Sequence, residues 1–295
     1  MPKLSPRDIR RKIQGIKNTR RITNAMKVVS AAKLRKAQEL IYASRPYSER
    51  LYEVLRNLST HTNLQSSPLF QVREERACDL VLITADRGLA GTFNISLIKK
   101  AEDFIAEKQR QGVKVNMIII GRKGAQYFGR RNYNILKVYE DVFRKEINFN
   151  VVKEVGELLR DRYSREESDC TVLMHNEMVT RASYKPLMRV FLPPKLTCEE
   201  YESTSTPETY GVYEFEVSIE ILVNKLLDLY LNYQIYRAML ESNAAEHFAR
   251  MVAMDNATRN ADELVKTWTL IFNKARQESI TSELIDIVNA VEAMK

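Results

Sequence analysis

The stretch Ser218–Leu240, SIEILVNKLLDLYLNYQIYRAML, decides the fold of this 295-residue chain. Its large apolar side chains recur at alternating steps of four and three residues, which is the spacing of a helical packing seam: Leu222, Leu226, Leu229, Tyr233, Tyr236 and Leu240. Ser218 is suited to an N-cap, and neither Gly nor Pro occurs after Gly211. The pattern predicts one helix from 218 to about 294, with a change of phase near Asn243.

Beyond that phase change the seam resumes in two further groups, at Leu264, Trp268, Ile271 and Ala275, and at Ile280, Leu284, Ile287 and Val291. The N-terminus carries equally clear helix signals, with Ser5 as N-cap, Pro6 at the first position and Asp8 in the first turn. Apolar residues follow at helical spacing: Ile9, Ile13, Ile16, Ile22, Met26, Val29, Leu40, Tyr47, Leu51 and Leu58. A second helix is therefore predicted over residues 5–58, although Gly15 and Pro46 weaken it.

The middle of the chain alternates short apolar strands with amphipathic helices. Strands are predicted at 78–84, 115–121, 135–139 and 171–174, with an edge strand at 187–192, and helices at about 92–108, 126–130 and 151–163. Such alternation is typical of a small, mainly parallel α/β sheet with right-handed crossovers. The predicted fold class is thus a small Rossmann-like α/β domain bracketed by a long antiparallel coiled coil. Its boundaries are 1–58 for the N-terminal helix, 59–211 for the α/β domain with its linkers, and 212–295 for the C-terminal helix.

The lengths of the two terminal helices are unequal. At about 1.5 Å per residue they measure roughly 80 and 115 Å, so an antiparallel pairing leaves about the last 23 residues without a partner. If residues 58 and 218 lie opposite each other in the antiparallel pair, the numbers of any two facing residues should add up to 276. An alanine-rich stretch, 241–261, would then face small residues of the N-terminal helix, giving either a thin rod or an ordinary coiled coil. The unpartnered end carries the stripe that begins at Ile280, and an exposed apolar stripe on a lone helix requires a partner.

Composition excludes several classes of protein. The chain is 44% hydrophobic and 28% charged, with mean hydropathy −0.36, and we expect a soluble protein without a secretory signal or membrane-spanning segment. Its three cysteines, Cys78, Cys170 and Cys198, have no metal-ligand spacing and are interpreted as reduced thiols. The motifs of P-loop, zinc-protease and serine-hydrolase sites are absent. The turn Asp86–Gly91 resembles a phosphate-binding loop, but it lacks the full dinucleotide fingerprint and a tight strand-to-helix turn explains it better.

The formal charge of +8 is concentrated at the N-terminus, where no acidic residue occurs between Ile9 and Gln38. Such a basic helix is suited to an anionic partner, either nucleic acid or an acidic protein surface. A basic coiled-coil nucleic-acid-binding protein is therefore the alternative function. The scarcity of aromatic residues before Tyr42 argues against base stacking, while the interleaved isoleucines indicate packing against protein.

Four blocks of sequence resemble one known family. These are IRRKIQGIKNTRRITNAMKVVSAAK at 9–33, DRGLAG at 86–91, ARMVAMDNATRN at 249–260 and NKARQESITSELIDI at 273–287. Together they resemble the gamma subunit of F-type ATP synthase, of the bacterial type, over essentially the whole chain. Cys198 is the only cysteine of the short 193–212 linker, so the regulatory disulfide of the plant chloroplast form is not expected.

The resemblance implies a non-catalytic rotor without a cofactor or metal. Gamma subunits form the central shaft that couples c-ring rotation, driven by protons or another ion, to conformational change in the catalytic beta subunits. The implied partners are the hexamer of alpha and beta subunits, the epsilon subunit and the c-ring, with no nucleic acid and with membrane contact only through the complex. The implied location is the cytoplasmic face of the bacterial plasma membrane.

Individual positions follow from the motif match. Lys33 and Arg87 fall where the family contacts acidic beta-subunit loops, and Arg276 and Gln277 fall where it hydrogen-bonds a beta subunit. The shaft and the apolar hexamer sleeve are expected to involve Met26 opposite Met251, and Ile280, Leu284, Ile287 and Val291. Contacts to the c-ring and epsilon side are expected at Tyr210, Tyr213 and Glu214.

Overall fold

The computed structural model describes residues 5–61, 68–144, 146–180, 183–194 and 219–294. These form two compact units, which are considered separately. The terminal unit combines Met1–Ala32 with Arg250–Lys295, and the central unit is Lys33–Ala249. Two helices, α1 (Pro6–His61) and α5 (Ile219–Ala293), contribute a segment to each unit.

Helix α1 begins as its sequence predicts. The Ser5 hydroxyl accepts the Asp8 N–H at 3.2 Å and donates to the Asp8 carboxylate at 2.7 Å, which satisfies one of the free backbone donors of the first turn. From Ile9 onward buried or half-buried positions recur every seven residues, as a left-handed coiled coil requires: Ile9, Ile16, Thr23, Ser30, Ala37, Ser44, Leu51 and Leu58.

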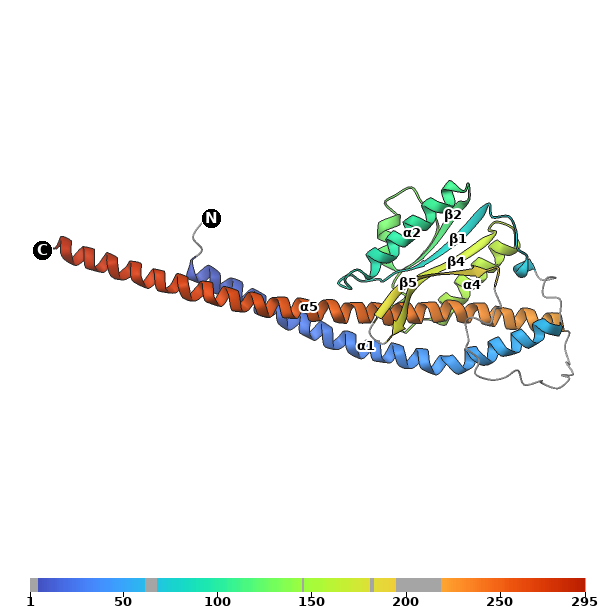
Figure 1. The fold of residues 1–295 in the computed structure, drawn as a ribbon, viewed down its shortest axis with the longest axis horizontal. Coiled ribbons are helices and arrows are strands. Elements are labelled where there is room, and N and C mark those ends of the chain that lie inside the picture. The colour runs from blue at the N-terminus through green and yellow to red at the C-terminus, as the bar shows by residue number, and fades with distance from the viewer. Residues whose placement is uncertain (1–4, 62–67, 145, 181–182, 195–218, 295) are drawn as a thin grey trace. The chain divides into compact units, whose positions relative to one another are not determined.

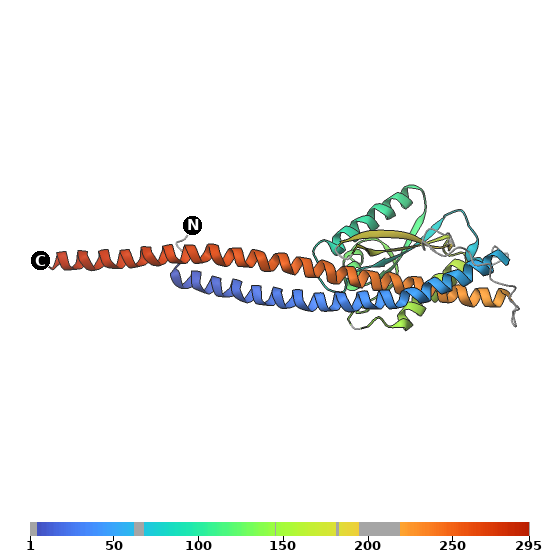
Figure 2. The same ribbon diagram turned by 60° about the horizontal axis from the view of Figure 1, so that its bottom comes forward.

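In the terminal unit α1 and α5 lie antiparallel, and α5 continues past the start of α1 (Figure 2). The register is fixed by Arg20 with Asp262, Thr23 with Thr258, and Lys27 with Asp255. Facing residue numbers therefore sum to 281 or 282, and the predicted sum of 276 was wrong. The prediction placed the end of α1 at residue 58, whereas α1 continues to His61 and α5 begins at Ile219.

The structure also corrects which residues of the two helices form the packing seam in the terminal unit. Ile22 is 60% exposed, whereas its polar neighbour Thr23 is 8% exposed. Val29 is exposed and Ser30 buried in the same way. The seven-residue repeat that starts at Ile9 selects positions 23 and 30, so small hydroxyl residues fill the seam and the larger apolar residues face outward. On α5, likewise, Leu264 and Ile271 are exposed, and the inward positions are Met254, Thr258, Ala261, Val265, Trp268, Phe272 and Ala275.

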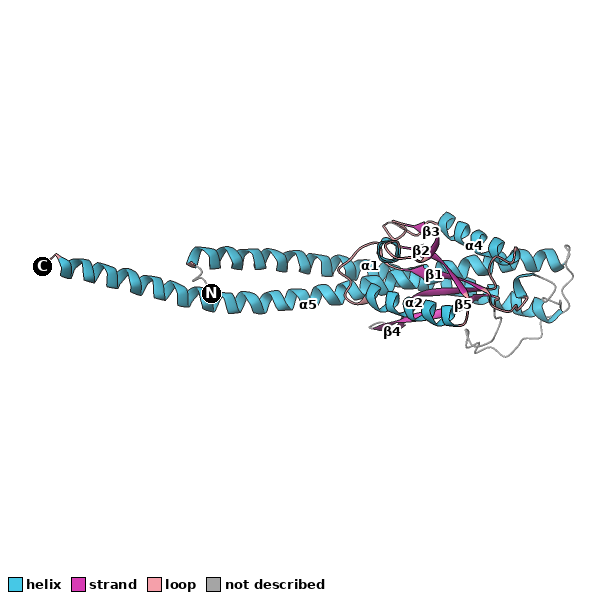
Figure 3. Ribbon diagram, turned by 90° about the horizontal axis from the view of Figure 1, so that it is seen from above, coloured by secondary structure: helices cyan, strands magenta, loops and turns pink. Residues whose placement is uncertain are grey.

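The central unit is built on one five-stranded sheet (Figures 1 and 3). Its strands are β1 (Ala77–Ile83), β2 (Lys114–Ile120), β3 (Asn134–Tyr139), β4 (Cys170–Thr180) and β5 (Ser183–Leu192), in the spatial order β3-β2-β1-β4-β5. The first four are parallel, and β5 is an antiparallel edge strand, as predicted. Every predicted strand and helix of this region is present, together with the short helix η2 (Pro68–Phe70).

Helices cover both faces of this sheet, which explains why β1 and β2 are apolar along almost their whole length. Alternate residues of β1 enter two different cores. Leu80 and Leu82 pack with α2 (Phe93–Arg110) and α3 (Arg122–Phe128), while Val81 and Ile83 pack with α4 (Phe149–Ser164) and with the segments of α1 and α5 that belong to this unit. Figure 1 shows α2 and α5 on opposite faces of the sheet.

Between residues 230 and 250, α5 is buried on nearly every side. It contacts α1 through rings, with Tyr233 against Tyr47 and Tyr230 against Tyr52. The small Ala245 and Ala249 pack on Ala85, Ala90 and Phe93 of the α/β region. Ala245 and Ala249 thus allow close approach of α5 to the α/β region.

Candidate functional site

Part of the basic array on α1 is neutralised within the terminal unit. Arg20 Nη1 lies 2.7 Å from Asp262 Oδ1, and Lys27 Nζ lies 2.6 Å from Asp255 Oδ1. The pKa of Asp255 is lowered, mainly because its carboxylate accepts hydrogen bonds from Lys27 and Arg259. Lys12 Nζ lies 4.0 Å above the Trp268 ring, a cation–π contact. These cations are held by α5, which reduces the charge available for a continuous phosphate-binding surface.

The acidic partners in α5 were missed by sequence reasoning, although a signal was present. Arg20 and Lys27 are seven residues apart, and so are Asp255 and Asp262. Matching seven-residue spacings of opposite charge on two helices identify facing positions of a coiled coil. Met26 and Met251, expected to face each other, are both half-buried in this unit.

Past Ala275, α5 presents exposed side chains on all sides. Arg276 and Gln277 are exposed and follow directly on the paired segment. Beyond them, the predicted apolar stripe is 49–60% exposed at each position: Ile280, Leu284, Ile287 and Val291. Ile285 and Val288 are exposed beside it, so the surface is broader than one seam. No described residue covers this surface, which we call the terminal stripe and define as Ile280, Leu284, Ile287 and Val291.

The turn after β1 is held by the Asp86 carboxylate. It accepts backbone N–H groups from Arg122 at 3.0 Å, Asp141 at 3.0 Å and Phe143 at 3.1 Å. The turn thus directs an anion inward, where it joins three segments of the chain and would repel a phosphate, which favours the tight-turn interpretation. Arg87, by contrast, is exposed and makes no ion pair with the described residues.

The place where α/β sheets usually bind ligands is filled by the chain itself. In such sheets the ligand crevice lies beyond the carboxyl ends of the strands, where the strand order reverses, here between β1 and β4. Ala85 and Ala90 follow β1 at this edge, and Ala245 and Ala249 of α5 pack against them. The helix therefore occupies the crevice that a cofactor would use.

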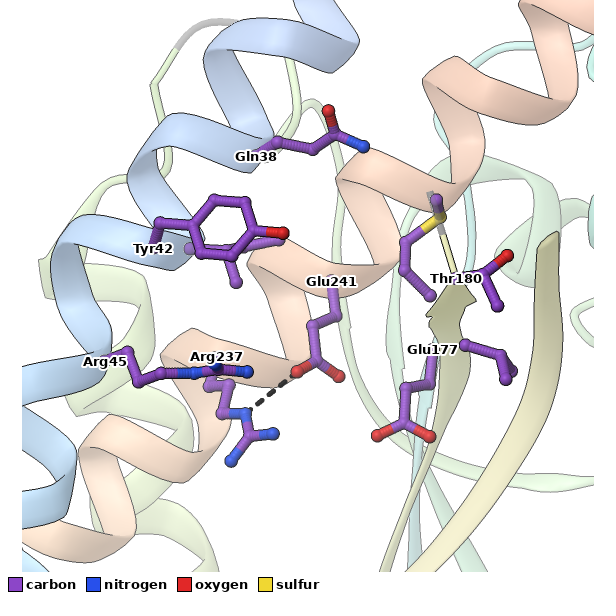
Figure 4. A pocket seen from close by; sticks show the side chains of 10 residues that line it. Gln38, Tyr42, Arg45, Glu177, Thr180, Arg237 and Glu241 are labelled. Atoms are coloured by element: carbon purple, nitrogen blue, oxygen red, sulfur yellow. Dashed lines mark hydrogen bonds and ion pairs between the residues drawn. The ribbon is translucent and has the colours of Figure 1, made fainter. Parts of the chain in front are cut away.

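A cavity of about 530 Å³ remains between α1, α5 and the end of β4. Figure 4 shows Tyr42 and Arg45 of α1, Arg237 and Glu241 of α5, and Glu177 of β4 along its walls. The Glu241 carboxylate is bound by Arg237 Nε at 2.8 Å and lies 3.4 Å from Nε2 of the buried His175.

Glu241 is the most buried acid of this cavity. Burial alone would raise its pKa, but the hydrogen bond with His175 and the charge of Arg237 outweigh burial and lower the pKa to about 2. A general acid must hold its proton near the working pH. Glu241 is therefore a structural anion and does not have the pKa of a general acid.

The remaining expected residues are placed as follows. Lys33 is exposed on the segment of α1 that belongs to the central unit, and it makes no ion pair with the described residues. Tyr210, Tyr213 and Glu214 lie outside the described residues, as does Cys198. Among the described helices none is long and apolar enough to cross a membrane. In the same described ranges no group of three or more His, Cys, Asp or Glu could hold a metal ion.

Comparisons with known proteins agree on one family. The ATP synthase family model matches residues 5–294. The ATP synthase gamma chain of Aquifex aeolicus is 64% identical over 295 residues, covering 100% of this chain and 99% of the relative. The gamma chain of a Hydrogenobaculum species is 57% identical over 295 residues, covering 100% of both.

Solved structures share the fold. A chain of the Euglena gracilis mitochondrial ATP synthase, solved with its F1 part and c-ring, matches with a TM-score of 0.66 at 19% identity, covering 98% of this chain and 94% of that one. A chain of the Tetrahymena thermophila mitochondrial central stalk and c-ring matches with a TM-score of 0.60 at 21% identity, covering 80% and 99%. Because the family model and the sequence relatives span its full length, this chain belongs to the ATP synthase gamma chain family.

Proposed function

We propose that this chain is the central rotor shaft of an F-type ATP synthase, which couples ion-driven rotation of the c-ring to conformational change in the catalytic beta subunits. It is a non-catalytic subunit of the central stalk. The observation that carries the proposal is the terminal stripe, because four large apolar side chains, each 49–60% exposed on a lone helix, need a surrounding partner.

The proposed occupant around the terminal stripe is the apolar sleeve of a hexamer of alternating alpha and beta subunits. Arg276 and Gln277 stand exposed at the base of that segment, where they would hydrogen-bond one beta subunit. Met26 and Met251 belong to the paired shaft. The epsilon subunit and the c-ring would bind through Tyr210, Tyr213 and Glu214. Through these partners the chain would sit peripherally at the cytoplasmic face of the plasma membrane.

The mechanism requires contacts that differ between states. A shaft can shift the open-to-closed equilibrium of a catalytic subunit only by the difference between its interaction free energies with the two states. Lys33 and Arg87 are suited to this because they are exposed cations that no described acid neutralises. As the shaft turns, each would meet the acidic loop of one beta subunit at a time, so identical subunits would adopt different states.

Transmission of torque requires that the two helices of the terminal unit do not slide past each other. The pairs Arg20–Asp262 and Lys27–Asp255 lie on either side of the hydrogen bond between Thr23 and Thr258. In each of these contacts the two bonded polar atoms are 2.6–2.7 Å apart. Sliding by one residue would break all three contacts together. This arrangement fixes register even though each exposed ion pair alone contributes only about 0–1 kcal/mol.

The test is neutralisation of the exposed cations. Lys33→Ala, Arg87→Ala and Arg276→Ala should each slow ATP synthesis, driven by an imposed ion gradient in vesicles, by up to about fivefold, because one exposed charge pair contributes about 0–1 kcal/mol. The triple variant should be slower than any single variant, since the sites are far apart in sequence and independent. Lys99→Ala, which removes an exposed charge from α2, is the matched control and should have no effect.

Complexes must first be shown intact on native gels. A triple variant that assembles and synthesises ATP at the unmodified rate would contradict the proposed contacts. So would complete loss of ATP-driven rotation from Lys33→Ala alone in an assembled complex.

A further inference from the structure

Two of the three cysteines lie directly opposite each other in the sheet. Cys78, the second residue of β1, is paired in register with Cys170, the first residue of β4. Neighbouring parallel strands are about 4.8 Å apart, which is inside the Cα separation of about 4.4–6.8 Å that a disulfide requires. Both side chains are buried and enter the same apolar core, and both are free thiols.

The backbone around this pair is fixed by Asp169. Its Oδ2 accepts the N–H of Arg76 at 2.9 Å and of Ala77 at 3.0 Å, while its own N–H donates to the Ala77 carbonyl at 2.8 Å. One side chain therefore ties the first residues of β1 to the residue before β4. The fold therefore holds the two cysteines side by side, at paired positions of neighbouring strands.

The two thiols differ in environment. Cys78 is fully buried, whereas Cys170 retains 5% exposure at the start of its strand. The interaction with Cys78 lowers the pKa of Cys170, burial and the nearby Glu75 carboxylate oppose this, and the Lys108 ammonium again favours the thiolate. The interaction with Cys170 and burial both raise the pKa of Cys78. Cys170 is thus the better nucleophile, and Cys78 is placed as the resolving thiol.

We propose that Cys78 and Cys170 form a reversible intrachain disulfide when the protein meets a hydroperoxide. The Cys170 thiolate attacks one oxygen of hydrogen peroxide and the O–O bond breaks. Cys170 becomes a sulfenic acid, and the hydroxide that leaves takes up the proton lost by the thiol and is released as water. Cys78 then attacks that sulfur, its proton leaves with the hydroxyl as a second water, and the S–S bond forms. Overall, two thiols are oxidised by two electrons and one hydroperoxide is reduced.

The unmodified chain provides the first test, because its three cysteines allow three different single disulfides. The full-length protein is treated with hydrogen peroxide without denaturant, remaining thiols are alkylated after unfolding, and the peptides are mapped by mass spectrometry. The expected product joins the peptides of Cys78 and Cys170, about 2 Da lighter than their sum, and dithiothreitol reverses it. In denaturant, where the strands no longer hold the pair together, links involving Cys198 should appear as well.

Single variants test the order of the two steps. Cys78→Ser should leave a sulfenic acid on Cys170 that dimedone traps, whereas Cys170→Ser should leave Cys78 unoxidised and no linked peptide. The circular dichroism spectra of both variants must match that of the unmodified chain. The disulfide mapping of the unmodified chain does not depend on these variants. Full alkylation of both thiols after native peroxide treatment would overturn the proposal. A native link that involves Cys198, or a Cys78–Cys170 link that forms only in denaturant, would overturn it equally.

Discussion

Asp86 shows how one side chain organises the edge of the α/β region. Its carboxylate accepts the N–H of the first residue of α3 and two N–H groups that follow β3, so one anion joins the turn after β1 to two other segments. Each N–H that loses its partner in a buried site costs about 1–3 kcal/mol. Asp86→Ala should therefore lower the free energy of unfolding by at least about 2 kcal/mol, measured by urea denaturation of the full chain.

The neighbouring Arg87 is a matched control, because it is exposed and contacts no described acid. Arg87→Ala should change stability by no more than about 0.5 kcal/mol while still slowing coupling. Equal stability of Asp86→Ala and the unmodified protein would contradict the structural interpretation of the turn.

Glu241 predicts a pH dependence of stability. Its pKa is lowered to about 2 in the folded chain, against about 4.3 for an unfolded Glu. A depressed folded pKa contributes stability that is fully present above the unfolded pKa and is lost as pH falls through the folded pKa. Between about pH 5 and pH 2 this one group should remove roughly 2–3 kcal/mol of stability, measurable by chemical denaturation at each pH.

Glu241→Gln removes the titration while keeping the shape of the side chain. The variant should be less stable than the parent at pH 7, because it loses the charged interaction with Arg237, and its stability should depend less on pH in that acid window. Identical pH profiles for parent and variant would rule out Glu241 as the source of the acid sensitivity.

At the scale of elements, the spacing of apolar residues predicted which helices and strands exist. It did not predict which face of α1 packs against α5. The chain offers two overlapping apolar sets on α1, and Ile22 belongs to the outer one. Apolar residues were assumed to face α5, whereas the strict seven-residue repeat buries Thr23 against Thr258. A single sequence cannot distinguish an apolar stripe that meets its own chain from one that meets other subunits, since burial has the same physical basis in both.

The candidate site was predictable to a similar degree. Family motifs led to Lys33, Arg87 and Arg276, and the structure leaves all three exposed. Pairing of Arg20 and Lys27 with α5 depended on register, which shifted because α1 continues to His61. The contact between Cys78 and Cys170 depended on the order of strands in the sheet, which spacing along the chain does not reveal.

Replacing each of two helical glycines by alanine should change stability in opposite directions. Gly156 lies in α4, where an added Cβ would come within 2.1 Å of Asn232 Oδ1 on α5. Gly156→Ala should therefore force α4 and α5 apart and destabilise the protein by about 1–3 kcal/mol. Gly15 lies in α1 with no atom within 4 Å of such a Cβ. Gly15→Ala should instead stabilise the helix by up to about 1 kcal/mol.

Thermal unfolding followed by circular dichroism measures both changes in the full-length chain. Because alanine has the higher helix propensity at both positions, only packing can reverse the sign at 156. If Gly156→Ala were as stable as Gly15→Ala, the close contact between α4 and α5 would be wrong.

At the scale of the whole molecule, the uneven lengths of α1 and α5 have a functional consequence. A chain that ends at Ser279 loses the terminal stripe but keeps the whole paired seam from Met254 to Ala275. The isolated truncated chain should therefore unfold at nearly the same temperature as the full chain, because the deleted side chains are mostly exposed and add little to its own core.

Assembly with alpha and beta subunits should respond very differently. Burying one large apolar side chain contributes about 1.5–3 kcal/mol, so each one lost weakens binding by about tenfold or more. Native gels of reconstituted complexes should show much less assembled enzyme with the truncated chain. A full-length variant with Gln at all four positions of the terminal stripe keeps the helix length and should fail similarly. Normal assembly of both variants would show that this surface is not held by a sleeve of partner subunits.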